Sequence, residues 1–230
     1  MTALLLELLQ RSAARHSHLC PRQVLGVRIG LAGVEALDIE VPDKQKRLFI
    51  FVETDGCFVD GIEVATGCRV GHRTLRVVDY GKIAATFVDV YTEKAVRVTP
   101  VLDARERARN YAPEERRRYF AQLHAYQVMP AEELLTVRKV SLRTPVQALI
   151  SRAGIRVNCD ICGEEIINER EIQIGVLTLC LACAGRAYYR VESQIEIKEK
   201  SVCRDPLGVE GTPPPVERVG QEEYVIKVGR

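Results

Sequence analysis

The sequence predicts an α+β protein, in which an antiparallel sheet carries packed helices and a small cysteine-rich module follows. Apolar residues first recur at helical spacing, as at Leu5, Leu8 and Leu9, and later alternate with polar residues at the spacing of strands. Beyond residue 158 the chain instead carries closely spaced cysteines. Its 230 residues suffice for one ordinary domain and a smaller one.

The N-terminal half predicts two further helices. We expect one to begin at Pro21 with Cys20 as its cap, because proline lacks the N–H that would stay unpaired there. Three glycines fall on one face of this helix and indicate close packing against another backbone: Gly26, Gly30 and Gly33. Residues 57–68, framed by two cysteines, predict a short helix that ends at Gly67.

Strands are predicted where short apolar or alternating runs are separated by glycines. Residues 47–55 indicate a buried strand, and three alternating runs then indicate a meander of antiparallel strands: residues 74–80, 82–92 and 94–101. Residues 103–126 favour helices, the second beginning at Pro113, and residues 133–144 favour another strand. We therefore expect an α+β core at 1–150, a cysteine module at 151–203, and a Pro/Gly-rich linker with a strand-like tail at 204–230.

Composition excludes several classes of protein. The net charge of +2 and the absence of tryptophan argue against general nucleic-acid binding or attachment to an anionic membrane. The apolar start lacks an early basic residue and is interrupted by Glu7, so it does not resemble a signal peptide, and no run is long enough to cross a bilayer. We therefore expect a cytoplasmic protein, in which eight cysteines indicate metal or thiol chemistry more than disulfides.

Four cysteines have the spacing of a structural zinc site: Cys159, Cys162, Cys180 and Cys183. Each Cys-x-x-Cys pair forms a tight turn that directs two sulfurs at one ion, and Gly163 suits such a turn. The pattern predicts a zinc ribbon or treble clef that depends on Zn²⁺ to fold. Unrelated buried cysteines or a redox pair are the alternatives. From residue 152 to 200, seven basic residues face eight acidic ones, which favours protein docking over DNA binding.

The segment "HSHLCP" at residues 16–21 places two of the four histidines beside a thiol. In an extended chain His16, His18 and Cys20 point to one side, as metal ligands would. A helix N-terminus also lowers the pKa of a thiol, which favours a reactive or metal-binding Cys20. The alternative is a capped helix with two surface histidines.

Three segments together resemble the FmdE-like family, named for one of the subunits of formylmethanofuran dehydrogenase: "HSHLCPRQVLGVRIG", "ETDGCFVDGIEVATGCRVGHRTLRVVDYGKIAATF" and the four-cysteine module. Members carry H-x-H-x-C-P, a cysteine before a D-[AG]-I helix, T-G-C-x-x-G and D-x-G-K. Many also end in a zinc finger of the TraR/DksA-like type. In this chain Ser17 replaces a common glycine, and Arg22 follows the Cys-Pro pair.

The resemblance implies an α+β core, usually a homodimer, with the finger appended. It implies a core site of His16, His18, Cys20 and Cys57, with Cys68 nearby. Cys20 and Cys57 are the candidate catalytic thiols. If the core site binds a metal, that ion would be a second divalent metal besides the zinc of the finger. The family name associates such proteins with a molybdenum or tungsten enzyme that reduces CO₂ to a formyl group. The resemblance therefore implies that enzyme as a protein partner, and it does not imply that this chain catalyses the reaction.

Several roles stay open. Lys82 and His72 are candidates for contacting an anionic ligand, or are plain turn residues. Glu53, Asp55 and Asp60 either orient ligands or are solvated turn carboxylates. Six arginines against three glutamates in residues 105–118 indicate a solvated helix face, with a contact to an anion or to RNA as the alternative. The protein is thus expected to be a metal-dependent accessory protein or enzyme of one-carbon metabolism. The alternative is a zinc-finger adaptor that acts through protein contacts without catalysis.

Overall fold

The computed structural model describes residues 2–16, 18–43, 45–150 and 154–193, and the backbone at 218–219 and 223–224. The chain forms two compact units: residues 1–156 with 166–170, and residues 157–165 with 171–230. The predicted tail at 204–230 lies outside the described residues apart from two short strands, β10 (Arg218–Val219) and β11 (Glu223–Tyr224).

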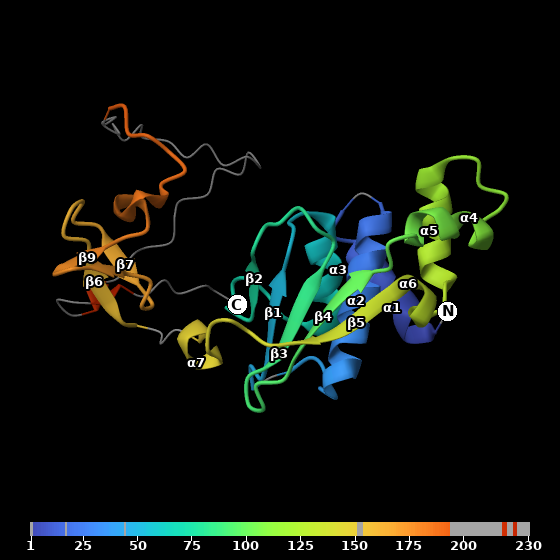
Figure 1. Cartoon of the computed structure of the whole chain (residues 1–230), viewed down its shortest axis with the longest axis horizontal. Coiled ribbons are helices and arrows are strands. Elements are labelled where there is room, and N and C mark those ends of the chain that lie inside the picture. The colour runs from blue at the N-terminus through green and yellow to red at the C-terminus, as the bar shows by residue number, and fades with distance from the viewer. Residues whose placement is uncertain are drawn as a thin grey trace. The chain divides into compact units, whose positions relative to one another are not determined.

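A five-stranded sheet in the order β2–β1–β3–β4–β5 forms the centre of the first unit (Figure 1). Its strands are β1 (Leu48–Val52), β2 (Leu75–Val77), β3 (Ala85–Asp89), β4 (Ala95–Pro100) and β5 (Leu135–Val140). The predicted α+β class is therefore confirmed. The predicted meander is wrong at one point, because β1 lies between β2 and β3 and pairs with β2 in parallel. The apolar β1 takes this inner place, and the three-residue β2 forms the edge.

Two helices lie on one face of the sheet, α2 (Pro21–Leu37) and α3 (Cys57–Thr66), and α1 (Ala3–Ala13) packs against both of them (Figure 1). Leu48, Ile50 and Val52 alternate from β1 into the main core beneath these helices. On the other face, Phe49 belongs to a smaller cluster with Val146 of α7 (Val146–Leu149).

The predicted packing of the α2 glycines against another backbone is confirmed for Gly26, whereas Gly33 faces a side chain, because a Cβ there would lie 2.4 Å from the Phe87 ring. A Cβ on Gly26 would overlap the carbonyl oxygen of Phe58 in α3, and one on Gly30 would lie 2.6 Å from the Cβ of Ala65. Gly61 of α3 faces Gly26 in return, since its Cβ would lie 2.8 Å from the Gly26 Cα. The two helices therefore touch backbone to backbone.

Three more helices precede β5: α4 (Ala104–Tyr111), α5 (Arg118–Val128) and α6 (Ala131–Leu134). The predicted helix start at Pro113 is wrong, because the Glu115 N–H donates to the Ala112 carbonyl and closes a turn there. Arg28 of α2 donates to the carbonyls of Tyr126 and Met129 at 2.8 and 2.7 Å and holds the end of α5.

The remaining described strands form two-stranded sheets, β6 (Arg156–Asn158) with β7 (Glu165–Ile167) and β8 (Ile172–Ile174) with β9 (Leu177–Leu179). A π-helical turn over Ala182–Arg186 follows. None of the helices in the described part of the chain has the length and apolar character needed to span a membrane.

Candidate functional site

Cys20 occupies the N-cap of α2, as predicted, and shares the cap with Gln23. The Cys20 sulfur accepts a hydrogen bond from the Gln23 backbone N–H at 3.4 Å, and the Gln23 side-chain oxygen accepts one from the Cys20 N–H at 2.9 Å. Gln23 also donates to the Ser12 carbonyl at 2.8 Å, which joins the cap to α1. These bonds hold the sulfur at the positive end of the helix.

Cys57 is the first residue of α3 and follows Gly56, whose φ of 75° turns the chain after β1. The thiols of Cys20 and Cys57 are hydrogen-bonding neighbours. Burial, and then the contact with Cys20, raises the pKa of the Cys57 thiol. The backbone contact between α2 and α3 thus brings together two cysteines that are 37 positions apart in the sequence.

A pocket of about 400 Å³ opens beside these two thiols. Apolar or aromatic side chains form part of its lining: Pro21, Leu25, Ile83, Tyr119 and Tyr126. Its other lining residues besides the cysteines are polar or basic: His18, Arg22, Arg105 and Gln122. None of these described lining residues carries a carboxylate, so the pocket has a positive electrostatic character.

The two histidines of "HSHLCP" lie in different surroundings. His18 lines the pocket with Cys20 and Cys57. The His16 ring nitrogen Nε2 instead lies 2.6 Å from a carboxylate oxygen of Asp60, whose other oxygen is 3.6 Å from the Arg15 guanidinium. The structure therefore joins three of the four candidate core ligands at one pocket and engages His16 with α3.

Other candidate residues lie apart from the pocket lining. Cys68, expected nearby, is buried in the core, where its thiol donates to the Leu48 carbonyl at 3.6 Å and burial raises its pKa to about 11. Lys82 and His72 lie in exposed turns, and the Lys82 ammonium is 6.0 Å from the Tyr80 ring. A ligand contact by Lys82 or His72 stays a prediction.

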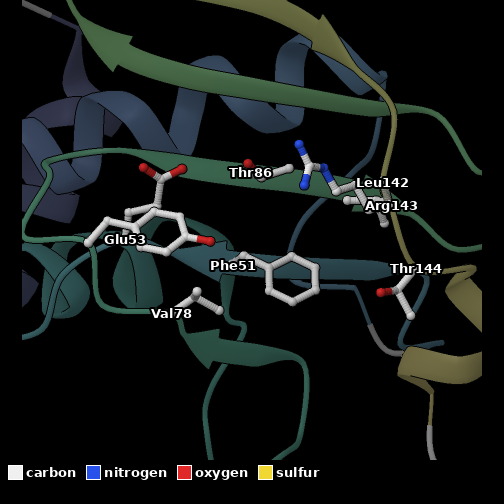
Figure 2. A pocket seen from close by; sticks show the side chains of 8 residues that line it. Phe51, Glu53, Val78, Thr86, Leu142, Arg143 and Thr144 are labelled. Carbon is white, nitrogen blue, oxygen red and sulfur yellow. The ribbon is translucent and has the colours of Figure 1, made fainter.

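A second pocket, of about 230 Å³, lies on the sheet face opposite α1–α3 (Figure 2). Phe51 and Thr86 line it together with Glu53, a candidate for orienting ligands. Arg97 donates two hydrogen bonds of 2.6 Å to the Glu53 carboxylate. Glu53 is therefore held by an arginine in this second pocket and does not line the pocket of Cys20.

The four-cysteine cluster lies in the second unit, in the turn after β6 and in the segment after β9. Its members are Cys159, Cys162, Cys180 and Cys183, and within the described residues their sulfurs all lie within 4.8 Å of one another. The sulfurs of Cys162 and Cys180 are 3.9 Å apart. Four thiolates at about 2.3 Å from a tetrahedral ion would be about 3.8 Å apart. The cluster therefore fits one metal ion.

Backbone N–H groups prepare the cluster for negative charge. The Cys180 N–H donates to the Cys159 sulfur, and the Cys183 N–H donates to the Cys180 sulfur, each at 3.4 Å. The N–H groups of Cys162 and Cys180 lower the pKa of the Cys159 thiol to about 6. Gly163, at a φ of 76°, donates to the Cys159 carbonyl and closes the first turn. The turn chemistry expected from the sequence is thus present.

The sequence reasoning missed the side chains that approach the thiols from other helices. Arg105 comes from α4, and Tyr119 and Gln122 come from α5. The arginine-rich stretch was the available signal, but it contains six arginines, and helical periodicity alone does not tell which of them turns toward a pocket.

An α+β domain with a thiol-lined pocket, followed by a four-cysteine cluster that fits a metal ion, defines a two-part metal-binding protein. Residues 15–136 match the family model described as "FmdE, Molybdenum formylmethanofuran dehydrogenase operon". Because this match covers more than half of the chain, the protein belongs to the FmdE family. The family expected from the sequence is therefore confirmed, while the TraR/DksA-like type of the finger stays a prediction.

Two similar proteins extend this comparison. A protein of Archaeoglobus fulgidus named "Probable S-adenosyl-L-methionine-binding protein" is 32% identical over 208 residues, covering 81% of this chain and 55% of that protein. The chain thus spans about half the length of this curated relative. The crystal structure of an FmdE-like protein of the tungsten formylmethanofuran dehydrogenase type, from Syntrophus aciditrophicus, has a TM-score of 0.53 and 23% identity, covering 81% of this chain and 95% of that chain. This likeness establishes the fold.

Proposed function

We propose that this protein is a cytoplasmic FmdE-family accessory protein with two metal-related sites. In the core domain, residues 1–150, the pocket of His18, Cys20 and Cys57 binds a small molecule, with a second divalent ion held by these side chains and His16 assisting. In the module at 151–203, the four cysteines hold a structural zinc ion. Residues 204–230 form a tail, and the chain acts as a homodimer.

One observation carries the core site. Two thiols from different helices meet at the lining of a pocket of about 400 Å³, with His18 beside them. Two thiolates and an imidazole are ligand types that suit Zn²⁺ and would leave a fourth coordination position open. Among the described residues only the four-cysteine cluster already has its ligand atoms within 4.8 Å of one another, so a core ion would have to draw the side chains of His18, Cys20 and Cys57 together. Such an ion would polarise a bound carbonyl group or activate water. Where the core has no ion, the pair of thiols would itself be the reactive group of the pocket.

The four-cysteine cluster supports zinc as the structural metal. Thiolate ligands in a tetrahedral arrangement are typical of structural zinc, and iron bound to four thiolates is the competing choice. Four protein ligands leave no position for a substrate, so this ion would stabilise the module rather than catalyse a reaction.

The family description supports a place beside a molybdenum or tungsten enzyme of one-carbon metabolism. The Archaeoglobus relative is named for S-adenosyl-L-methionine, but this chain spans only 55% of it. The described lining of the core pocket carries two arginines and no carboxylate. This does not favour the positively charged sulfonium of that ligand, so we do not assign it to the pocket.

A zinc-finger adaptor is the second candidate, favoured by exposed apolar side chains in the cysteine module. Ile161 and Leu181 stand between the cysteines of the two pairs and are 62% and 45% exposed, and Val176 is 95% exposed. Apolar side chains around a rigid metal site are suited to contact a protein partner.

Metal content per full-length chain tests the proposal. We expect about two ions in the wild type, and about one in Cys20→Ser and in Cys57→Ser. Serine is a preferred N-cap residue, so Cys20→Ser keeps α2 capped and removes only the sulfur ligand. Cys68→Ala, a change to a core cysteine outside the pocket, is the matched control and should keep both ions. One ion in all four proteins would exclude the core metal and leave the thiol form of the site.

A further inference from the structure

We propose that the pocket beside Cys20 and Cys57 selects a small organic carboxylate and that Arg22 and Arg105 hold its negative charge. This inference rests on the proposed function, because it names the class of ligand for the same pocket.

The charge of the lining is the first argument. Arg22 and Arg105 line the pocket with His18, and among the described residues neither arginine forms an ion pair with a carboxylate. Asp60, one turn beyond Cys57 in α3, is already engaged by His16 and Arg15. The two guanidinium groups are therefore available to an anion from solution.

The position of Arg22 is the second argument. Arg22 lies in the first turn of α2, which contains no acidic residue. A cation at the positive end of a helix is unfavourable for helix stability, and an aspartate or glutamate would be preferred there. A bound carboxylate would remove this conflict, since it would meet both the arginine and the helix dipole. The position of Arg22 therefore favours the binding of an anion and disfavours the stability of the helix.

The apolar walls indicate an organic ligand. Leu25, Ile83 and Tyr126 offer apolar surface to the pocket, which an inorganic oxyanion would not use. A carboxylate with a short hydrocarbon body would place its charge at the arginines and its body against these walls. Its remaining end would then lie toward the two thiols.

Two alkylating reagents of the same size test the charge preference. Iodoacetate carries a carboxylate and iodoacetamide is neutral, and with either one a thiolate sulfur forms a bond to the CH₂ carbon while iodide leaves. Alkylation of Cys57 in the full chain is followed by peptide mass spectrometry, and the iodoacetate-to-iodoacetamide rate ratio is divided by that of free N-acetylcysteine. We expect this normalised ratio to be about tenfold above one at low salt and to fall at high salt.

Charge-removing variants make the test specific. Arg22→Gln and Arg105→Gln should each lower the ratio roughly three- to tenfold. Arg138→Gln, which removes an exposed arginine of β5 outside the pocket, should leave it unchanged. Butyrate should slow the labelling of Cys57 more than equimolar butyramide, acetate or inorganic phosphate does. Equal protection by phosphate and butyrate would overturn the organic part of the proposal.

A normalised ratio near one in the wild type, or a ratio that neither pocket variant changes, would overturn the proposal. If a bound ion blocks both reagents, the comparison is made after treatment with a chelator, with the metal content measured on the same sample. The metal content shows whether a core ion is present. The normalised iodoacetate-to-iodoacetamide rate ratio separately shows whether the pocket prefers a carboxylate. The two proposals can therefore fail separately.

Discussion

Replacing Gly26 by alanine tests whether the contact between α2 and α3 sets the geometry of the thiol pocket. The added methyl group would overlap the Phe58 carbonyl oxygen and lie 3.0 Å from the Gly61 Cα. Both are backbone atoms, so no rotamer change relieves the overlap, and the helices must separate. Alanine gains about 1 kcal/mol of helix propensity. Overpacking costs about 1–3 kcal/mol, and a backbone clash belongs at the upper end. We expect a net loss of about 1–2 kcal/mol.

The buried Cys68 thiol provides an assay that reports on the first unit alone. Brief thiol labelling across a guanidinium chloride series, read at Cys68 by mass spectrometry, gives the free energy of unfolding of that unit. The same displacement moves Cys57 away from Cys20, so labelling of Cys57 under native conditions should also change.

Gly71→Ala is the matched control, because a Cβ at Gly71 would have no other atom within 4 Å. It should leave both stability and Cys57 labelling unchanged. If Gly26→Ala were as stable as the wild type, the close helix contact would not be needed, and this account of how the two thiols meet would be wrong.

Three further predictions follow from other contacts. Arg47 donates two hydrogen bonds to the buried Asp89 carboxylate and holds its pKa well below the usual range, so this stabilisation is present above about pH 4 and is lost as pH falls below it. Asp89→Asn should therefore cost about 2–3 kcal/mol at neutral pH in denaturant unfolding, and the difference should shrink in acid; a constant difference would contradict this. Cys162→Ser should release one equivalent of metal and make the cysteine module sensitive to protease, whereas Ile161→Ser, the adjacent exposed position, should retain the ion. With a pKa of about 11, only about one in a thousand Cys68 thiols is ionised at pH 8, so labelling of the folded protein should spare Cys68.

The features that could be predicted from the sequence are those encoded within a few residues. Pro21 after Cys20 specifies a helix start, and the Cys-x-x-Cys pairs specify two turns that end in metal ligands. In each case the physical cause, a missing N–H or a tight turn, lies inside the motif itself. The glycines of α2 were informative in part: they indicate a close approach on one helix face, which is the backbone of α3 at Gly26 but the Phe87 ring at Gly33.

The features that could not be predicted depend on which elements become neighbours. The place of β1 between β2 and β3 is a property of the whole sheet, and Tyr119 and Gln122 reach the pocket because Arg28 ties the end of α5 to α2. His16 shows the same limit. Alternation along an extended chain would place the His16 side chain beside that of His18. The backbone instead bends at His16, and the His16 ring contacts the Asp60 carboxylate.

The identity of the residue at the cap of α2 bears on function more directly than its position does. Serine, aspartate and asparagine are the side chains that cap helices best, and a cysteine sulfur accepts a longer, weaker hydrogen bond, here 3.4 Å from the Gln23 N–H. Stability alone would therefore select another residue at position 20. The nearby Arg22 is also placed against the helix dipole. Cys20 and Arg22 thus both disfavour the helix, and both line the same pocket. This is expected of a binding site at a helix N-terminus, because a bound ligand supplies the stabilising interactions that these two residues do not.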